Sequence, residues 1–475
     1  MKSFRQNVRA DLSKGLHDAR HTSVDHHNGP EEKPHDSHRD QAHSGTSHLH
    51  ALALFGTFPS RQNANSCKKK NDRNEENHRF TTHDYVGGFD KDSFDALGGW
   101  RAQRYTQTTP MRAWIEIDLS ALQKNLDTIR GYIGGDCGVY AVVKADAYGH
   151  GIEPVCRTLD ANHIDGFAVI GFEEALRVRS VSSRPVLVMG YLDRDELAEA
   201  IRLGLELSVY DRSLWDEISQ IAQRSGRVAQ VHLKVETGLN RLGMSECETI
   251  EVLELAKTEQ NIQVCGIFSH LSNSASRSDV LDQHERFLRV LPIAQEQGVP
   301  AHMVKSHALP QYPEGQLDFV RVGLAVYGFE EVIPGLIPAM SAKTVIMQRK
   351  KLAKGEGVSY GKQFVAPHDM EIAVMAMGYA EGLSLSMSEK FQVLVNGQFA
   401  RQIGRVCMNL SVIDVTGIPA ERGDEVVVVG TQGELTIRAC DIAAWTGIRQ
   451  HEIVTRLGKS LPKVYVREAS AVVSG

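Results

Sequence analysis

Residues 140–151 read YAVVKADAYGHG, in which a short apolar strand delivers one lysine, Lys144, into a loop bounded by Gly149 and Gly151. A lysine that ends an apolar strand is most often a solvated strand end. At the mouth of a parallel barrel it would instead be desolvated and close to other cations, so that its pKa falls and its amine can form a Schiff base. The role of Lys144 therefore depends on the fold around it.

Eight short, β-branched apolar runs alternate with amphipathic helical segments in the middle of the chain. They are residues 138–143, 166–170, 185–189, 206–210, 229–235, 264–269, 302–305 and 318–321. Strands that alternate with helices form βαβ units and a parallel sheet, and eight of them within about 200 residues indicate a (β/α)8 barrel of the TIM type. We predict an α/β fold in which this barrel occupies residues 111–340.

The segments on either side of these runs have a different pattern. Residues 113–119 alternate as a half-buried strand, and Ser120 is the expected N-cap of a helix over residues 121–133. After residue 340 the strand-like runs are joined by Gly-rich turns. This pattern indicates a mainly β C-terminal domain over residues 341–475.

Residues 1–110 differ from the rest of the chain in composition, since 11 of the 20 histidines lie there among Asp, Asn, Ser and Arg. Few apolar residues recur with a helical or strand period, so burial would not offset the entropy lost on ordering. We predict a disordered extension. Its histidines suit adventitious metal binding, but a solvated tail is the simpler interpretation.

The overall composition excludes several classes of partner. The formal net charge is −6, which gives no indication of a nucleic acid or membrane surface as a partner. No apolar run approaches the roughly 20 residues that a membrane helix needs. The seven cysteines are dispersed without any C-x-x-C pair, which indicates a reducing compartment and no zinc site. We expect a cytoplasmic protein with no metal in its site.

Polar residues lie at the ends of five of the eight predicted strands, namely Lys144, Lys234, His270, Ser306 and Arg321. The chemistry of a parallel barrel is located at the C-terminal ends of its strands, so these side chains are expected to converge on one face. A phosphate site in the loops after the seventh and eighth strands is a recurring feature of such barrels. The converging polar residues and the expected phosphate site together favour a reactive Lys144 over a solvated strand end.

The stretch around Lys144 resembles the cofactor-lysine motif of the alanine racemases, pyridoxal-phosphate enzymes that interconvert L- and D-alanine. Similar segments continue to about residue 465, with VHLKVETGLNRLG at 231–243, GIFSHL at 266–271, RVGLAVYG at 321–328, GVSYG at 357–361, GYAEG at 378–382 and GRVCMN at 404–409. The resemblance implies a homodimeric racemase that supplies D-alanine for peptidoglycan in a bacterial source. It also implies that the strand 113–119 packs with the C-terminal domain.

The resemblance assigns pyridoxal phosphate to Lys144, which would hold it as a Schiff base. The groups implied for its phosphate are Tyr148, Ser306 and the backbone amides at Gly323 and Leu324. Arg321 matches the arginine that faces the pyridine nitrogen, and because arginine keeps its protons it would donate to an unprotonated nitrogen and weaken the electron sink. His270 matches the histidine that orients this arginine.

Inversion of a stereocentre needs a base on each face, and the resemblance supplies Lys144 for one face and Tyr360 for the other. In the family this tyrosine comes from the partner subunit, so a head-to-tail homodimer with shared active sites is implied. A tyrosine with a pKa near 10 is a poor base at neutral pH unless its neighbours favour the phenolate. His270 and Arg321 are the neighbours that we expect.

The resemblance also implies the substrate-binding groups. Arg241 matches the arginine that binds the substrate carboxylate, and Lys234 matches a lysine that is often carbamylated and pairs with it. A carbamate would convert Lys234 from a cation into an anion that holds Arg241. Met408 would offer a backbone amide to the carboxylate, and Tyr379 would line the entrance.

The chain departs from the family pattern close to the site. Asn409 stands where aspartate is usual, His451 replaces a tyrosine, Lys305 replaces an asparagine and Glu236 replaces an aspartate. These departures leave open a serine or broad-specificity racemase of the same fold. A different class is a non-catalytic pyridoxal-phosphate carrier, but such carriers lack the second domain and its GVSYG tyrosine. A barrel binding protein with an incidental lysine would not explain the convergence of strand ends.

Overall fold

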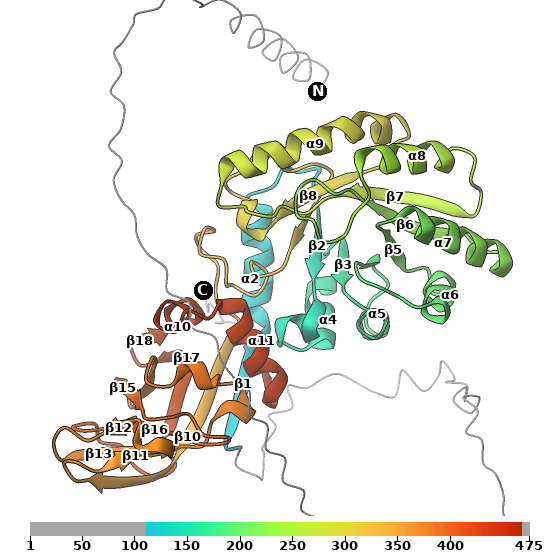
Figure 1. The fold of residues 1–475 in the computed structure, drawn as a ribbon. Helices are drawn as coiled ribbons and strands as arrows, with labels where there is room; N and C mark the ends of the chain where they lie inside the picture. The colour runs from blue at the N-terminus through green and yellow to red at the C-terminus, as the bar shows by residue number, and fades with distance from the viewer. Residues whose placement is uncertain (1–110, 468–475) are drawn as a thin grey trace, which may run out of the picture. The chain divides into compact units, whose positions relative to one another are not determined.

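The computed structural model describes residues 111–467 (Figure 1). The disorder and the metal-binding histidines considered for residues 1–110 lie outside the described residues. Eight parallel strands close into a barrel in the order β2-β3-β4-β5-β6-β7-β8-β9. The strands are β2 (Gly138–Val142), β3 (Gly166–Val169), β4 (Val186–Val188), β5 (Glu206–Val209), β6 (Ala229–Lys234), β7 (Ile262–Phe268), β8 (Ala301–Lys305) and β9 (Phe319–Val322). Each lies within two residues of a predicted strand, so the barrel prediction is confirmed.

Helices connect the strands and surround them (Figure 1). They are α2 (Leu119–Arg130), α3 (Lys144–Tyr148), α4 (Ile152–Ala161), α5 (Phe172–Arg179), α6 (Arg194–Arg202), α7 (Arg212–Ser225), α8 (Glu246–Ala256) and α9 (Arg277–Glu296). Each longer helix buries one apolar stripe against the barrel, as Trp215, Ile218 and Ala222 do on α7. The predicted cap of α2 was wrong, because the Asp118 carboxylate accepts from the Ser120 amide at 2.8 Å and the helix begins at Leu119.

The inside of the barrel has an apolar half and a polar half. Alternate positions on β2 to β4 place Tyr140, Val142, Ala168 and Leu187 in one small cluster. Strands β5, β6, β8 and β9 also place buried polar or charged side chains inside the barrel, beside the rings of Phe268 and Phe319. They are Glu206, Ser208, His232, Lys234, His302 and Arg321. An apolar filling is usual in such barrels. The functional site is therefore expected next to these buried polar side chains.

The prediction of a mainly β C-terminal region is also confirmed. A nine-stranded sheet has the order β18-β17-β14-β15-β16-β13-β10-β1-β19, and β11 and β12 form a separate pair. The strands are β1 (Ala113–Asp118), β10 (Met340–Leu352), β11 (Gly357–Val358), β12 (Phe364–Val365), β13 (Met370–Met375), β14 (Gln392–Val395), β15 (Gln398–Ile403), β16 (Ser411–Asp414), β17 (Glu425–Gln432), β18 (Leu435–Ile437) and β19 (Lys463–Val466). The helices here are α10 (Ala439–Thr446) and α11 (Gln450–Ser460).

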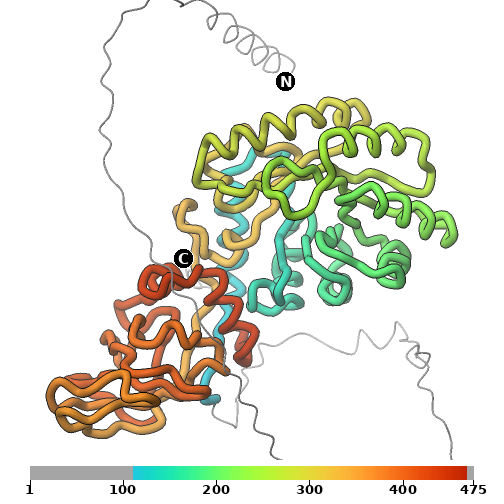
Figure 2. The backbone as a smooth tube through the Cα atoms, in the orientation of Figure 1, coloured from blue at the N-terminus to red at the C-terminus, as the bar shows by residue number. Residues whose placement is uncertain are grey.

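Strand β1 lies in this sheet although it precedes the barrel in the sequence. It pairs antiparallel with β10 and parallel with β19. Figure 2 shows this blue strand among the orange and red strands of the C-terminal region. The domain division between residues 340 and 341 stays a prediction. Within residues 111–467, no helix has the length and apolar character that a membrane crossing requires.

Helix α11 packs against α3, the short turn that follows the barrel strand β2. A Cβ atom added at Gly458 of α11 would lie 2.2 Å from the carbonyl oxygen of Gly149. On the same side, Lys463 forms an ion pair of 3.0 Å with Asp146. The C-terminal region therefore holds the loop that carries Lys144.

We expect Gly458→Ala to lower the melting temperature by about 2 °C or more, because overpacking of a tight backbone contact costs on the order of 1–3 kcal/mol. A thermal melt monitored by circular dichroism measures the change. Gly134→Ala is the matched control, since nothing lies within 4 Å of a Cβ atom added there. Equal melting temperatures for the two variants would contradict the packing argument.

Candidate active site

Lys144 lies at the C-terminal end of β2, where α3 begins. Burial lowers the pKa of its amine, the charge of Arg241 lowers it further, and Glu174 opposes the shift. The Glu174 carboxylate also accepts a hydrogen bond of 2.6 Å from the Ala145 amide, which fixes the backbone after the lysine. The amine therefore loses its proton more readily than that of an exposed lysine, as an amine nucleophile requires.

The turn after Lys144 is left-handed, with φ angles of 53° to 57° at Ala145, Asp146, Ala147 and Tyr148. Consecutive residues with a Cβ atom rarely adopt this conformation, because it costs about 1–2 kcal/mol for each. Asp146 holds the turn in place. Its carboxylate accepts from the Ile152 amide at 3.1 Å and pairs with Arg177 at 2.7 Å and Lys463 at 3.0 Å. The backbone beside Lys144 is thus strained and tied down from outside.

Three of the groups predicted to bind phosphate meet at one place. The Ser306 hydroxyl accepts from the amides of Gly323 and Ala325 at 2.9 and 3.4 Å. A Cβ atom added at Gly323 would lie 2.8 Å from the Tyr148 hydroxyl oxygen, so glycine keeps this approach open. Burial raises the pKa of Tyr148 to about 12, so its hydroxyl keeps its proton. The hydroxyls of Ser306 and Tyr148 and the backbone amides of the turn at Gly323 and Leu324 are suited to bind a phosphate group.

Arg321 on β9 is buried to 3% exposure. Its Nη2 donates to the Ser269 carbonyl at 2.6 Å, and its Nη1 donates to the His302 carbonyl at 3.1 Å and lies 2.5 Å from His302 Nδ1. Among residues 111–467, no carboxylate lies within ion-pair distance of this guanidinium. Burial lowers its pKa to about 9, so it remains a cation at neutral pH.

His270 lies beside Arg321 without a close contact to its guanidinium. Its Nδ1 is 3.5 Å from Arg321 Nη2, which is long for a hydrogen bond. Burial and the neighbouring cations Arg321, Lys305, Lys234 and Arg241 hold its pKa far below the usual range, so the ring is neutral. The tighter contact comes from His302, a residue that sequence reasoning did not single out. The available signal was a histidine at an inward position of an otherwise apolar strand.

Lys234 is buried and surrounded by cations. Burial, Arg321 and Arg241 lower the pKa of its amine to about 8, and its Nζ lies 5.2 Å from the centroid of the Phe268 ring. Arg241 is exposed on the following loop. Glu236 shapes that loop, because its carboxylate accepts a hydrogen bond of 2.5 Å from the Gly238 amide. A buried amine whose pKa is lowered by two nearby guanidinium groups loses its proton more easily than an ordinary lysine, which is typical of functional sites.

Two departures from the family pattern lie next to these groups. Lys305 donates to the Leu271 carbonyl at 3.0 Å, and burial lowers its pKa. His451, in the first turn of α11, has a pKa lowered by partial burial and by the charges of Arg449 and Lys144. The barrel mouth therefore has a surplus of positive charge, which favours anionic ligands such as phosphate and carboxylate.

Tyr360, Tyr379 and Met408 form a second group, carried by loops of the C-terminal region. The Tyr379 amide donates to Cys407 at 3.0 Å, and the Ser359 hydroxyl, next to Tyr360, donates to Arg405 at 2.7 Å. The Asn409 side chain, which replaces the usual aspartate, donates a hydrogen bond of 2.9 Å to the Glu381 carboxylate within this region. Tyr360 is 70% exposed and Met408 is 56% exposed. In the described chain no hydrogen bond or ion pair joins the Tyr360 side chain to Lys144.

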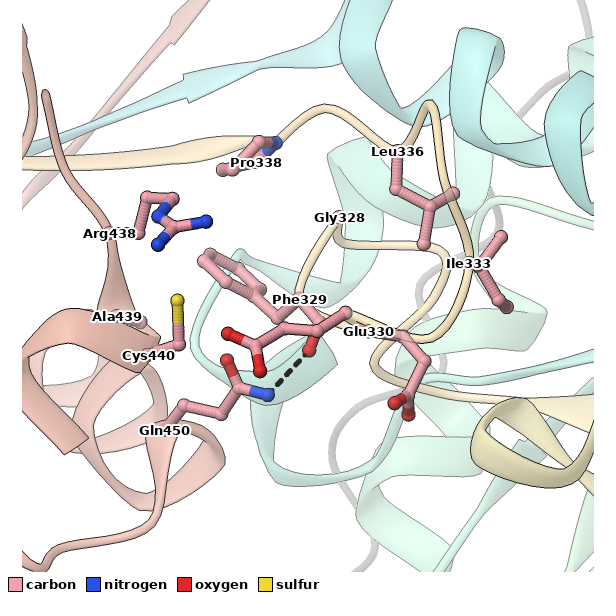
Figure 3. Close-up of a pocket in the computed structure, with 11 residues that line it drawn as sticks. Gly328, Phe329, Glu330, Ile333, Leu336, Pro338, Arg438, Ala439, Cys440 and Gln450 are labelled. Atoms are coloured by element: carbon pink, nitrogen blue, oxygen red, sulfur yellow. Dashed lines mark hydrogen bonds between the residues drawn. The ribbon is translucent and has the colours of Figure 1, made fainter. Parts of the chain in front are cut away.

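A pocket of about 240 Å³ lies apart from both groups, between the segment after β9 and helix α10. Figure 3 shows Phe329, Cys440 and Gln450 around it, with Gln450 donating to the Phe329 carbonyl at 2.7 Å. Glu330 at its rim is paired with His307 at 2.9 Å. None of the predicted site residues lines this pocket, so the barrel mouth remains the candidate site. Over residues 111–467, no cluster of His, Cys, Asp and Glu side chains is arranged to hold a metal ion.

Two family models match the chain in succession. The model described as alanine racemase, N-terminal domain, matches residues 117–331, and the one described as alanine racemase, C-terminal domain, matches residues 339–465. Alanine racemase 2 of Caldanaerobacter subterraneus subsp. tengcongensis is 34% identical over 366 residues, which are 74% of this chain and 94% of that one.

Solved structures have the same fold. An alanine racemase from D-cycloserine-producing Streptomyces lavendulae superposes with a TM-score of 0.72 at 32% identity and covers 75% of this chain and 98% of its own. An alanine racemase from Bartonella henselae with covalently bound pyridoxal phosphate has a TM-score of 0.69 at 25% identity and covers 75% and 100%. The similarity therefore extends over both the barrel and the C-terminal region.

Proposed function

The chain belongs to the alanine racemase family, and we propose that it interconverts L-alanine and D-alanine with pyridoxal phosphate as its cofactor. One observation carries the proposal. Lys144, whose amine loses its proton easily, shares the barrel mouth with the buried cation Arg321 and with the Ser306 and Gly323 cradle. Such a set suits a cofactor that has an aldehyde, a ring nitrogen and a phosphate.

The residues present fit this cofactor. Lys144 would hold it covalently, and its phosphate would take the cradle of Tyr148, Ser306, Gly323 and Leu324. Arg321, with His270 beside it, would face the ring nitrogen. When bound, pyridoxal phosphate supplies an electron sink that acidifies the α-proton of an amino acid. The Bartonella henselae enzyme, which has the same fold, is described with the cofactor covalently bound.

Lys144 and Tyr360 would move the protons of the reaction. We assign to the Lys144 amine the proton on one face of the substrate α-carbon, and to the Tyr360 hydroxyl the proton on the other. Arg241 would bind the substrate carboxylate through its fork of donors, helped by the Met408 amide. Tyr379 would line the entrance to the site.

The exposure of Tyr360 supports a homodimer. Its side chain is 70% exposed, and other large apolar or aromatic residues in loops of the C-terminal region are exposed as well, namely Tyr379, Leu385, Met408 and Leu410. Exposed apolar groups of this kind mark interaction surfaces. We propose that this surface covers the barrel mouth of a second copy, so that each active site takes Lys144 from one subunit and Tyr360 from its partner.

We expect Lys234 to carry a carbamate. An amine with a pKa of about 8 is about half unprotonated at pH 8 and can then react with carbon dioxide. The resulting anion would lie close to the cations Arg241 and Arg321, which lower that pKa. Labelling with 13C-bicarbonate should give a carbamate signal in carbon NMR. The signal should vanish in Lys234→Ala and persist in Lys305→Ala, another lysine that is partly buried at the barrel mouth. No signal in the unaltered protein would refute the modification.

Racemisation in D2O tests the proposed function. Purified protein with pyridoxal phosphate is incubated separately with L-alanine and L-serine, and both chirality and α-deuteration are followed. Rapid formation of deuterated D-alanine with slow serine turnover is expected. Comparable serine turnover would indicate a broad-specificity racemase, in line with the departures at His451, Asn409 and Lys305. Bound cofactor without exchange would favour the non-catalytic carrier. We also propose that the protein acts in the cytoplasm and supplies D-alanine for peptidoglycan.

A further inference from the structure

Five buried side chains form a continuous line across the inside of the barrel. Arg321 Nη1 lies 2.5 Å from His302 Nδ1, and His302 Nε2 lies 2.9 Å from His232 Nδ1. His232 Nε2 lies 3.2 Å from Glu206 Oε2, which accepts a hydrogen bond of 2.8 Å from the Tyr140 hydroxyl. The five residues come from β9, β8, β6, β5 and β2, and none is more than 7% exposed. The line therefore lies wholly within the barrel.

Neighbouring groups hold the two histidine rings in place. The His302 ring stacks on Phe268 with a centroid distance of 5.0 Å and an interplanar angle of 7°. The His232 ring fills the space above Gly266, where an added Cβ atom would lie 2.5 Å from Nδ1. These contacts fix the plane of each ring, and in this orientation each ring nitrogen of the two histidines lies next to a polar atom of the line.

The chemistry of the two ends leaves one arrangement of protons. A guanidinium only donates, so His302 Nδ1 must accept from Arg321 and the ring proton must be on Nε2. This proton is donated to His232 Nδ1, so the His232 proton must be on Nε2, where it faces Glu206. An ionised carboxylate only accepts and can take both this proton and that of Tyr140. Both histidines are then neutral. The weakest link is between His232 Nε2 and Glu206 Oε2, which lie 3.2 Å apart without the alignment of a hydrogen bond.

The charges in the line agree with this arrangement. Burial opposes ionisation of Glu206, but the contacts with His232, Tyr140 and Arg179 prevail and lower the pKa of the carboxyl group. Burial and the charge of Arg321 hold the pKa of His302 well below its usual value. Glu206 is thus an anion and His302 is neutral at pH 7.

We propose that Glu206 is a positioning residue that acts through His232 and His302 to keep an acceptor aimed at Arg321. Glu206 begins β5, near the N-terminal end of the barrel, whereas Lys144 and Lys234 lie at the C-terminal ends of their strands. If the acceptor at Glu206 were lost, His232 and His302 could each carry the proton on Nδ1. Two donors would then face each other at Arg321, and the guanidinium would shift. Its effect on catalysis rests on the proposed function, because Arg321 is there the partner of the cofactor ring nitrogen.

Nitrogen NMR of protein labelled in its histidine rings tests the proton order without cofactor. The signals are assigned with His302→Gln and His232→Gln. Both residues are expected to show an unprotonated Nδ1 and a protonated Nε2. A proton on His302 Nδ1, or a doubly protonated ring at pH 7, would overturn the proposal. This readout does not depend on racemase activity, so a failure of the proposed function leaves it unaffected.

Three variants test whether Glu206 sets this order. Glu206→Leu should give mixed tautomers at the His232 and His302 rings. It should also weaken the binding of pyridoxal phosphate about tenfold or more, because the buried Arg321 guanidinium would lose its acceptor at His302 Nδ1. Glu206→Gln retains an acceptor oxygen and should keep the order. Tyr140→Phe, the matched control, removes a donor from the same carboxylate and should also keep it. Retention of the order in a folded Glu206→Leu protein, or its loss in Glu206→Gln, would show that Glu206 is only structural.

Discussion

Lys144→Ala will purify without covalently held pyridoxal phosphate and will lose racemase activity by at least about 10³-fold. The variant removes the amine that we assign both to the covalent link and to proton transfer, and a positioned acid or base alone contributes about 10²–10⁴-fold. The protein should keep its fold, because alanine leaves the contact between Glu174 and the Ala145 amide intact. Visible absorbance before and after borohydride reduction, together with mass spectrometry, measures the covalent link.

Lys305→Ala is the control for this experiment. Lys305 is also partly buried at the barrel mouth, and its amine donates to the Leu271 carbonyl at 3.0 Å. This variant should therefore keep the reducible chromophore. Borohydride-stable attachment of the cofactor in Lys144→Ala would show that another amine holds it.

Tyr360→Phe should lower kcat by about 10²–10⁴-fold in both directions while cofactor binding is retained. Only the hydroxyl is removed, and this hydroxyl is our candidate for the base on the second face. Since the side chain is 70% exposed within one chain, the substitution should leave the stability nearly unchanged. Tyr379→Phe removes an exposed hydroxyl from the same group and should have a much smaller effect. Initial rates from L-alanine and from D-alanine measure both variants.

Mixed dimers show which subunit supplies Tyr360. If each site is shared, a dimer of one Lys144→Ala chain and one Tyr360→Phe chain contains one complete site. Random mixing of two inactive variants would then restore about a quarter of the unaltered activity, because half of the dimers are hybrids. If Tyr360 served its own chain, no activity would return. Mixing is done by co-expression, and the dimers are separated by affinity tags.

Much of the architecture could be predicted because it is encoded locally. The eight strands follow from short, continuous β-branched apolar runs that alternate with helical segments, and the position of Lys144 follows from the end of one such run. The C-terminal strands follow from the same pattern with glycine turns between them. Polar residues at strand ends, such as Ser306 and Arg321, could be expected to converge, since parallel strands of a barrel end on one face.

The left-handed turn after Lys144 could not be predicted in this way. Alanine, aspartate and tyrosine favour right-handed backbone, and no glycine marks the four positions. The conformation depends on Asp146, whose partners Arg177 and Lys463 lie 31 and 317 residues further along the chain. Contacts at that separation are set by packing and leave no local pattern.

The sequence by itself determined the barrel, the C-terminal sheet and the strand ends at which Lys144, Lys234, Ser306 and Arg321 converge. Only the tertiary structure decided which groups hold Arg321. His302 is its closest partner, although the family pattern indicated His270. The reason is physical, because a strand pattern tells which residues face inward but not which of them meet across a closed barrel. That is set by strand register and ring packing, which join Arg321, His302, His232, Glu206 and Tyr140 from five strands into one line.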